Sequence, residues 1–207
     1  AHRTATPHVR EMGTIAGNIC QFNRCWYFRN PDNRFFCIRK GGKQCYAMAG
    51  DNRYHSIFGA GKMGLAVNPS DTAPALVALN AKIKTNKRLI EAEQFWEMKV
   101  PGSTALAVDE IVTEIQIPAL PAGVKSAFIK FAIRKSIDFP IVNCAVLVNG
   151  GAARVRLHAV GPKPQRATKA EEAMAGTAIN EANAEGGGAA RTGDAGGASK
   201  NRWKGQV

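Results

Sequence analysis

The alternation of apolar and polar residues predicts where regular structure begins in this chain. Residues 20–66 show little apolar periodicity and are rich in glycine, asparagine, arginine and aromatic residues, which predicts a long ordered loop or insertion. The signals then change, because Ser70 or Asp71 can cap a helix, Pro74 is tolerated in its first turn, and an apolar run follows. The pattern therefore predicts a short, largely buried helix that continues over residues 75–79.

Shorter alternating segments follow this helix and predict paired strands. Residues 81–85 and 87–90 alternate around Asn86, which indicates a hairpin, and residues 91–97 suit one or two helical turns. Further strands are predicted at residues 110–118, 126–135, 141–149 and 153–160, with a hairpin turn at Asn149, Gly150 and Gly151.

The end of the chain combines helical segments with a glycine-rich stretch. Residues 166–176 and 179–185 are predicted to be helical, whereas residues 186–197 have the Gly- and Ala-rich composition of a linker or a frayed surface segment. Antiparallel strands followed by helices predict an α+β domain with the helices on one face of its sheet. We expect two domains, residues 1–100 and residues 101–207.

The composition suits a soluble protein and does not point to nucleic acid as a partner. The chain has 207 residues, 45% of them hydrophobic, and a formal net charge of +12. The basic residues are spread along the chain without an arginine-rich block, so the charge indicates a solvated or partner-facing surface rather than a nucleic-acid interface. No apolar run is long enough to span a membrane and the first residues lack a secretory pattern, which predicts a cytoplasmic protein.

Four of the five cysteines lie close together in the sequence, at Cys20, Cys25, Cys37 and Cys45. Their spacing, C-x4-C-x11-C-x7-C, lacks the C-x2-C pair of a zinc ribbon. It is compatible either with an iron–sulfur cluster or with free thiols. Cys144 lies in an apolar run and is expected to be a small core residue.

Several single residues could serve structure or chemistry. In the segment 14–18, Gly17 lets the backbone approach a ligand closely and N–H groups could meet pyrophosphate oxygens, although the segment taken by itself favours a tight turn. Asp71 suits either a helix cap or a carboxylate that accepts hydrogen bonds from a nucleotide cofactor. Taken alone, Lys130 reads as a solvated strand lysine and His55 as a surface or hydrogen-bonded histidine.

Four motifs occur in order along the chain. They are Arg10-x-Met12-Gly13-Thr14-Ile15-x-Gly17-Asn18, Asn68-Pro69-Ser70-Asp71-x-Ala73-Pro74-Ala75-Leu76, Asp109-Glu110-Ile111-Val112 and Phe128-x-Lys130-Phe131-Ala132-x-Arg134. Their joint occurrence resembles the flavin-binding medium subunit of the molybdenum hydroxylases, the group of xanthine dehydrogenase, carbon monoxide dehydrogenase and aldehyde oxidoreductases. The resemblance covers residues 9–185.

The resemblance implies both a fold and a set of cofactor contacts. The fold would be α+β: the C-terminal half of a vanillyl-alcohol-oxidase-type FAD-binding domain, followed by a domain like the C-terminal domain of the CO dehydrogenase flavoprotein. FAD-binding roles are implied for Thr14, Ile15, Ala16, Gly17, Asn18, Asp71, Val112 and Lys130. Residues 14–18 would hold the flavin diphosphate and ring region, Val112 would pack against the flavin, and Lys130 would lie close to it. The glycine-rich segment with which family members begin does not precede Ala1, so we expect this stretch alone to bind flavin weakly or not at all.

The loop between the first two motifs resembles one branch of that family. Its cysteine motifs are similar to the inserted loop of the hydroxybenzoyl-coenzyme-A reductase and periplasmic aldehyde oxidoreductase medium subunits, which carries a [4Fe-4S] cluster. The resemblance implies Cys25, Cys37 and Cys45 as metal ligands. The fourth ligand is expected where this chain has Met63 and Gly64, so Cys20, another residue or solvent would have to complete the cluster.

The implied function is electron transfer within a multi-subunit oxidoreductase. A large molybdopterin-binding subunit would act on the organic substrate and a small [2Fe-2S] subunit would relay electrons. This chain would pass them through FAD to or from an external carrier such as NAD, ferredoxin or a quinone. Two alternatives remain, a scaffold subunit that has lost its cofactor and a basic, metal-bearing nucleic-acid-binding module.

Overall fold

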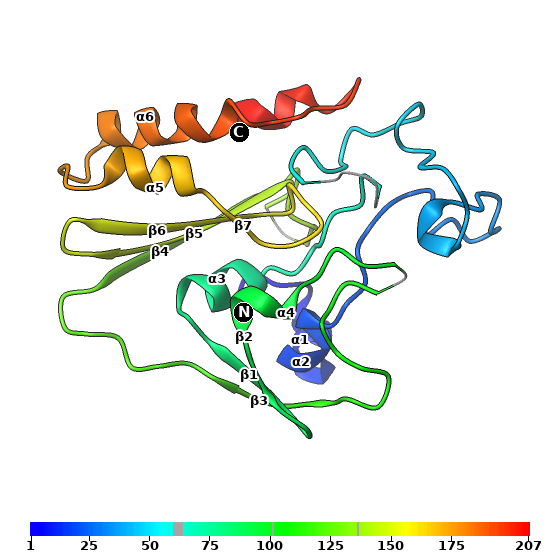
Figure 1. Ribbon diagram of the computed structural model, residues 1–207, viewed down its shortest axis with the longest axis horizontal. Helices are drawn as coiled ribbons and strands as arrows, with labels where there is room; N and C mark the ends of the chain where they lie inside the picture. The colour runs from blue at the N-terminus through cyan, green and yellow to red at the C-terminus, as the bar shows by residue number, and fades with distance from the viewer. Residues whose placement is uncertain (60–63, 101, 136) are drawn as a thin grey trace.

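The computed structural model describes residues 1–59, 64–100, 102–135 and 137–207 (Figure 1). Its α-helices are α1 (Pro7–Met12), α2 (Ile15–Ile19), α3 (Ala73–Ala78), α4 (Ala92–Phe95), α5 (Thr168–Met174) and α6 (Glu181–Thr192), and its 3-10 helices are Ile38–Lys40 and Arg202–Gln206. Its strands are β1 (Lys82–Thr85), β2 (Leu89–Glu91), β3 (Val112–Gln116), β4 (Lys125–Phe131), β5 (Val142–Asn149), β6 (Ala152–His158) and β7 (Gln165–Arg166). These elements form two antiparallel sheets with helices, which confirms the predicted α+β class.

The first sheet has the strand order β2-β1-β3. Its central strand buries Ile83, which lies opposite Ile90 of β2 and Ile115 of β3. Phe95 of α4 and Ile19 of α2 complete the core on this face. Burial of these side chains removes apolar surface from water and holds the first two helices against the sheet.

One strand joins a different sheet from the one expected. The segment 110–118 was expected to pair with the later strands, but its strand β3 pairs with β1. Alternation in the sequence identifies a strand without identifying its partner. Here Ile115 fits the apolar face that β1 and β2 already bury, so β3 completes the first sheet.

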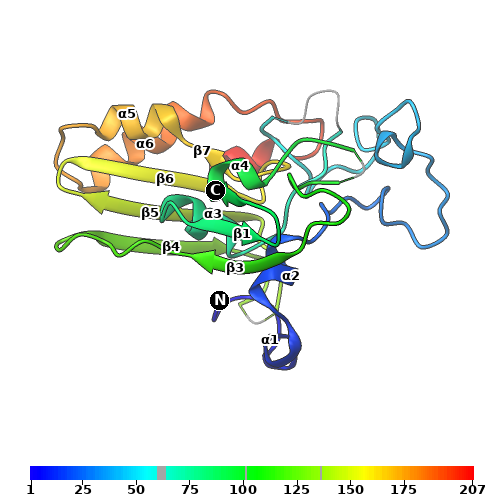
Figure 2. The ribbon, with the colours of Figure 1, turned by 60° about the horizontal axis from the view of Figure 1, so that its bottom comes forward.

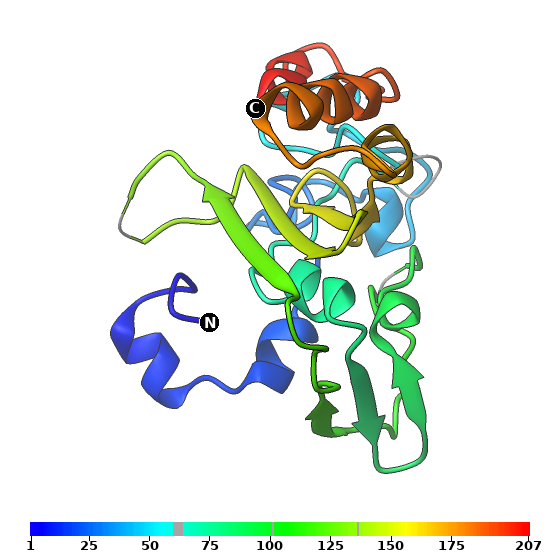
Figure 3. The same ribbon diagram turned by 90° about the vertical axis from the view of Figure 1, so that its left-hand side faces the viewer.

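The second sheet has the order β4-β5-β6-β7 and lies between two helical layers. Helices α5 and α6 cover one face, as expected, and α3 lies on the other, between the two sheets (Figure 3). The predicted turn between β5 and β6 is confirmed, with Gly150 in the left-handed conformation at φ 58°. Helix α3 thus packs against both sheets and holds the two halves of the chain together.

Helix α6 corrects the prediction of a linker at residues 186–197. Residues 186–192 belong to this helix, and Gly187 is buried against α5. A Cβ atom at Gly187 would lie 3.3 Å from the Ala170 carbonyl oxygen and 3.4 Å from Cγ of Met174. The glycine therefore permits close helix packing, a use that composition does not distinguish from flexibility.

The cysteine-bearing loop extends from one end of the molecule, at the right in Figures 1 and 2. Within the described ranges it has one short 3-10 helix, a β-bridge from Arg24 to Val67, and otherwise turns and irregular chain, as the sequence predicts for a long ordered loop. The distant residues Asn201 and Lys204 fasten its later part. Asn201 Nδ2 donates to the carbonyls of His55 and Ser56 at 3.2 and 3.0 Å, and Lys204 Nζ donates to the Tyr54 carbonyl at 3.1 Å.

Candidate functional site

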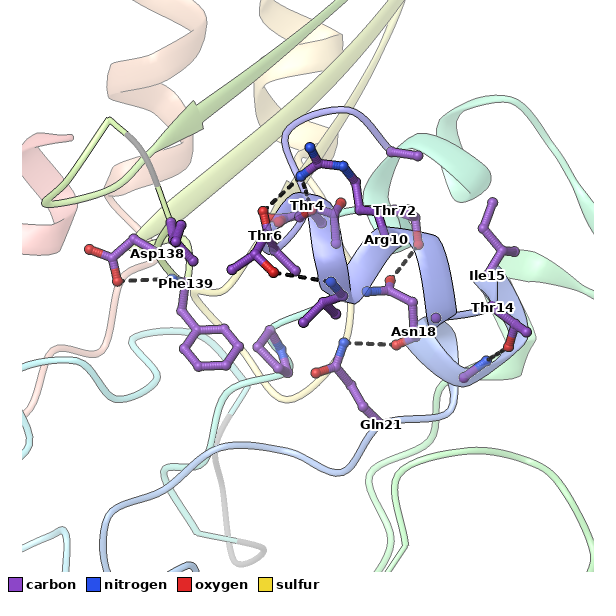
Figure 4. A pocket seen from close by; sticks show the side chains of 18 of the residues that line it. Thr4, Thr6, Arg10, Thr14, Ile15, Asn18, Gln21, Thr72, Asp138 and Phe139 are labelled. Atoms are coloured by element: carbon purple, nitrogen blue, oxygen red, sulfur yellow. Dashed lines mark hydrogen bonds between the residues drawn. The ribbon is translucent and has the colours of Figure 1, made fainter.

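A cavity of about 590 Å³ lies between the N-terminal helices, the residues that precede α3, and the β4–β5 connection. Figure 4 shows these three parts facing one another, with Phe139 on one side and Thr14 and Asn18 on the other. The volume is in the range of small-molecule and cofactor pockets, roughly 300–1,000 Å³. Thr14, Ile15, Gly17, Asn18 and Asp71, all predicted FAD-binding residues, line it.

The motif at residues 14–18 forms a capped turn of helix on the cavity wall. Thr14 is the N-cap of α2, and its Oγ1 accepts a hydrogen bond from the Gly17 N–H at 3.0 Å. A Cβ atom at Gly17 would come within 3.3 Å of that hydroxyl oxygen. Glycine therefore keeps the cap intact and leaves the wall open for a ligand to approach the backbone.

Asn18 connects this motif to the residues before α3. Its Oδ1 accepts hydrogen bonds from Ser70 Oγ and from Thr72 Oγ1, each at 2.7 Å. Two donors at the same oxygen fix the orientation of the amide, since only the oxygen can accept. The Nδ2 group is thereby turned away from these hydroxyls.

Asp71 lines the cavity and does not cap helix α3. Thr72 is the N-cap residue of α3 but makes no side-chain capping bond, and the Ala73 N–H instead donates to Ser70 Oγ at 3.1 Å. The Asp71 oxygens face protein donors: Oδ2 receives Lys130 Nζ at 2.8 Å and Oδ1 receives Asn143 Nδ2 at 2.9 Å. The Lys130 and Asp71 side chains are only 5% and 7% exposed, so the expectation of a solvated lysine is wrong.

Three of the predicted flavin residues do not line the cavity. Lys130 binds Asp71 from the second sheet, and Ala16 is half-buried on α2. Val112 begins β3 and packs against the core of the first sheet. The described cavity-lining residues therefore include five of the eight predicted positions.

Cationic and aromatic side chains complete the cavity wall. Arg10 donates from Nη1 to the carbonyls of Thr4 and Ala5, at 2.8 Å each. The Arg24 guanidinium lies 4.8 Å from the centre of the Phe139 ring. Burial and the nearby Arg29 lower the pKa of Arg24. Arginines beside aromatic and aliphatic surface suit a ligand that combines phosphate with a planar ring, as FAD does.

Sequence reasoning did not find Arg24 or Phe139. Both belong to connecting loops and lie 115 residues apart in the sequence, so no local sequence pattern predicts their contact.

Cys25 lies near two of the other clustered cysteines, Cys37 and Cys45. Burial raises the pKa of Cys25, and nearby Cys45 and Cys37 raise it further. Burial lowers the pKa of Arg39, and the same three thiols act in the opposite direction on that pKa. Cys20 lies apart from them, at the end of α2 against the first core. The structure thus groups Cys25, Cys37 and Cys45 and excludes Cys20.

A histidine joins this group. His55 is buried, and its Nε2 lies 3.3 Å from the Cys25 Sγ. Burial lowers the pKa of His55 to about 4, so the ring is neutral at pH 7. A neutral histidine beside a thiol with a raised pKa is not an activated Cys/His nucleophile.

The described residues do not complete a four-thiolate site. A Cβ atom on Gly64 would lie 3.4 Å from the Cys45 Sγ, so the position expected for the fourth ligand is near the thiols but carries no side chain. Met63 lies outside the described residues. In the described ranges no group of three or more His, Cys, Asp or Glu side chains is arranged to hold a single metal ion. A [4Fe-4S] cluster with four protein thiolates does not fit these residues.

The fold and the cavity define an α+β protein that can hold a phosphate-bearing aromatic cofactor. Comparison with known proteins gives the family. Residues 1–120 match the FAD binding domain in molybdopterin dehydrogenase, and residues 127–200 match the CO dehydrogenase flavoprotein C-terminal domain. The chain therefore belongs to the family of FAD-binding domains of the molybdopterin dehydrogenases, as the motifs predicted.

Two curated relatives support this assignment. The chain is 32% identical over 179 residues to the aldehyde oxidoreductase FAD-binding subunit PaoB of Escherichia coli, covering 81% of this chain and 55% of the relative. It is 32% identical over 153 residues to the nicotine 6-hydroxylase medium subunit of Paenarthrobacter nicotinovorans, covering 67% and 52%. The chain spans about half the length of both relatives.

Solved structures share the fold. Carbon monoxide dehydrogenase from Hydrogenophaga pseudoflava aligns with a TM-score of 0.64 at 21% identity, over 99% of this chain and 59% of that one. The enzyme from Oligotropha carboxidovorans aligns with a TM-score of 0.64 at 20% identity, over 99% and 60%.

Among the described residues, no helix has the length and apolar character needed to cross a membrane.

Proposed function

We propose that this chain is the FAD-binding part of an electron-transfer subunit in a molybdenum hydroxylase. The observation that carries the proposal is the cavity wall formed jointly by Thr14, Gly17, Asn18 and Asp71 in a chain of the FAD-binding family. Bound FAD would supply the redox chemistry. The chain's residues bind and orient the cofactor: Asn18 offers an amide donor, Asp71 an acceptor, and Phe139 an apolar surface.

The partners follow by analogy with the relatives. One relative is named as a FAD-binding subunit and another as a medium subunit, which supports a complex with other chains. We propose a large molybdopterin-binding subunit and a small [2Fe-2S] subunit as these partners, and NAD, ferredoxin or a quinone as the external carrier. Family membership favours this function over nucleic-acid binding. A cytoplasmic location stays a prediction of the sequence.

The test is the flavin content of the complex purified through this chain under anaerobic conditions. We expect flavin absorption bands and FAD released on denaturation in proportion to the chain. Gly17→Val should lower this ratio, whereas Gly186→Val, at a helix position with open space around it, should not. A complex that assembles without FAD would support the scaffold alternative and reject the proposed role.

We also propose that Cys25, Cys37 and Cys45 are the residues that would hold an iron–sulfur cluster in this chain. The proximity of Cys37 and Cys45 to Cys25, and of Gly64 to the Cys45 Sγ, supports this second candidate. The missing fourth thiolate opposes a complete [4Fe-4S] site, and a three-thiolate cluster would need a non-protein ligand or one iron fewer.

Iron and acid-labile sulfide measurements test the cluster. If it forms, Cys37→Ser should lower the iron content of the complex, and the matched Cys20→Ser variant should not, because Cys20 lies apart from the group. Iron that matches the small subunit's clusters alone in the unmodified complex would make the three cysteines ordinary thiols.

A further inference from the structure

Lys130 and Asn143 face each other across β4 and β5. They are direct partners in the antiparallel register of the two strands, so their side chains lie on the same face of the sheet. Both reach the Asp71 carboxylate, one at each oxygen, at 2.8 and 2.9 Å. A cross-strand pair therefore holds a carboxylate that lines the cavity.

Lys130 and Asn143 belong to a row of side chains across the sheet, which His158 extends to β6. His158 is the register partner of Asn143, and its Nε2 lies 3.1 Å from Oδ1 of Asn68. Burial lowers the pKa of His158 to about 3, so the neutral ring donates from Nε2 to that oxygen. Asn68 Oδ1 also accepts from the Ser70 N–H at 3.1 Å. Three neighbouring strands thus fasten the segment 68–71.

The row leaves Asp71 able to receive a ligand. A carboxylate has about four lone-pair sites on its two oxygens, and each oxygen here uses one for a protein donor. Asn143 is fully buried and the Lys130 side chain nearly so, so the two donors hold the Asp71 carboxylate in one orientation. The directions of its remaining lone pairs are therefore fixed. The lysine also balances the carboxylate charge, which reduces repulsion of an anionic ligand.

We propose that Asn143 is a positioning residue for FAD, which orients Asp71 so that its free lone pairs accept hydrogen bonds from the cofactor. This inference rests on the proposed FAD-binding function. Asn143 belongs to none of the four sequence motifs and does not line the cavity itself. It acts through Asp71, whose second oxygen Lys130 holds.

The first test is FAD retention by the purified complex carrying Asn143→Leu. Leucine keeps a similar volume and removes the donor, so we expect roughly tenfold weaker FAD binding, the effect of losing one hydrogen bond to a charged group. The flavin midpoint potential should also shift, because the carboxylate near the cofactor reorients. The matched control is Cys144→Ala on the same strand, whose side chain faces the opposite side of the sheet, toward α5. Its FAD affinity should stay within about twofold of the unmodified complex.

A second measurement needs no flavin. In a double-mutant cycle of thermal unfolding, Asp71→Asn and Asn143→Leu should be non-additive, because the two side chains contact each other. Unchanged FAD affinity and potential in Asn143→Leu overturn the positioning role while FAD binding itself stands. Absence of FAD from the unmodified complex rejects the proposed function instead, and additive unfolding effects reject the Asp71–Asn143 contact.

Discussion

Lys130 and Asp71 form a buried ion pair at 2.8 Å although 59 residues separate them in the chain. The pair connects the edge strand of the second sheet to the segment that lines the cavity. Its position makes it both a stabilising contact between the two halves of the chain and a support for the wall of the cavity. These two roles can be separated by substitution.

Replacing Lys130 with methionine should destabilise the protein strongly. The change leaves the Asp71 carboxylate buried without its cation, and breaking a buried pair from one side costs about 3–5 kcal/mol. Urea unfolding of the purified chain measures this loss. The double variant Lys130→Met with Asp71→Asn should recover part of it, because no uncompensated charge remains.

The control for this prediction is Lys84→Met. Lys84 pairs with Glu114 at 3.3 Å, but both side chains are about half exposed. Surface pairs of this kind contribute roughly 0–1 kcal/mol. Equal losses in Lys84→Met and Lys130→Met would contradict a special role for the buried pair.

The flavin potential should respond to the two charges of the pair in opposite directions. In the assembled complex, Asp71→Asn leaves an extra positive charge beside the cavity and should raise the midpoint potential, since reduction adds negative charge to the flavin. Lys130→Met leaves an extra negative charge and should lower it. Spectroelectrochemical titration measures both shifts. Shifts of the same sign would mean that the pair acts on the cofactor through shape rather than charge.

Stability should fall in mild acid because His55 is buried in its neutral form. Its pKa is lowered from 6.5 to about 4, so the unfolded state binds more protons than the folded state between these values. The stability contributed at neutral pH is therefore lost as the pH falls from 6.5 toward 4, by about 3 kcal/mol over the whole window.

Urea unfolding at a series of pH values tests this linkage. His55→Gln should flatten the dependence between pH 6.5 and 4. The control is His8→Gln on α1, where the side chain is exposed. A pH dependence that is the same in His55→Gln as in the unmodified protein would rule out His55 as its source.

Adding a side chain at Gly187 should destabilise the contact between α5 and α6. Gly187→Ala places a methyl group 3.3 Å from the Ala170 carbonyl and should lower the melting temperature. Gly186→Ala has open space around it and should raise stability by roughly 0.5–1 kcal/mol through helix propensity. Thermal unfolding followed by circular dichroism compares the two. Stabilisation by both changes would show that α6 is loosely packed.

The sequence predicts the local elements of this protein better than their partners. The hairpin of β1 and β2, the turn at Gly150 and the buried helix α3 all follow from nearby residues. The pairing of β3 with β1 does not, because strand alternation carries no information about the neighbouring strand.

In the candidate site too, the sequence predicts single residues better than the contacts between distant residues. The motifs predicted Asp71 and Asn18, and both line the cavity, whereas the alternative of Asp71 as a helix cap is wrong because the Ala73 N–H donates to Ser70 Oγ. Asn143 was hidden in an apolar strand, and its contact with Asp71 spans 72 residues. Long-range hydrogen bonds of this kind depend on the register of the sheet, which the sequence does not state.

The fastening of the cysteine loop by Asn201 has a consequence for biosynthesis. The bond from Asn201 to the His55 carbonyl joins residues 146 positions apart. During translation the loop emerges before Asn201, so this fastening forms only after synthesis has passed residue 201. Any chemistry performed on Cys25, Cys37 and Cys45 has that interval of the nascent chain in which to occur before the loop is fixed.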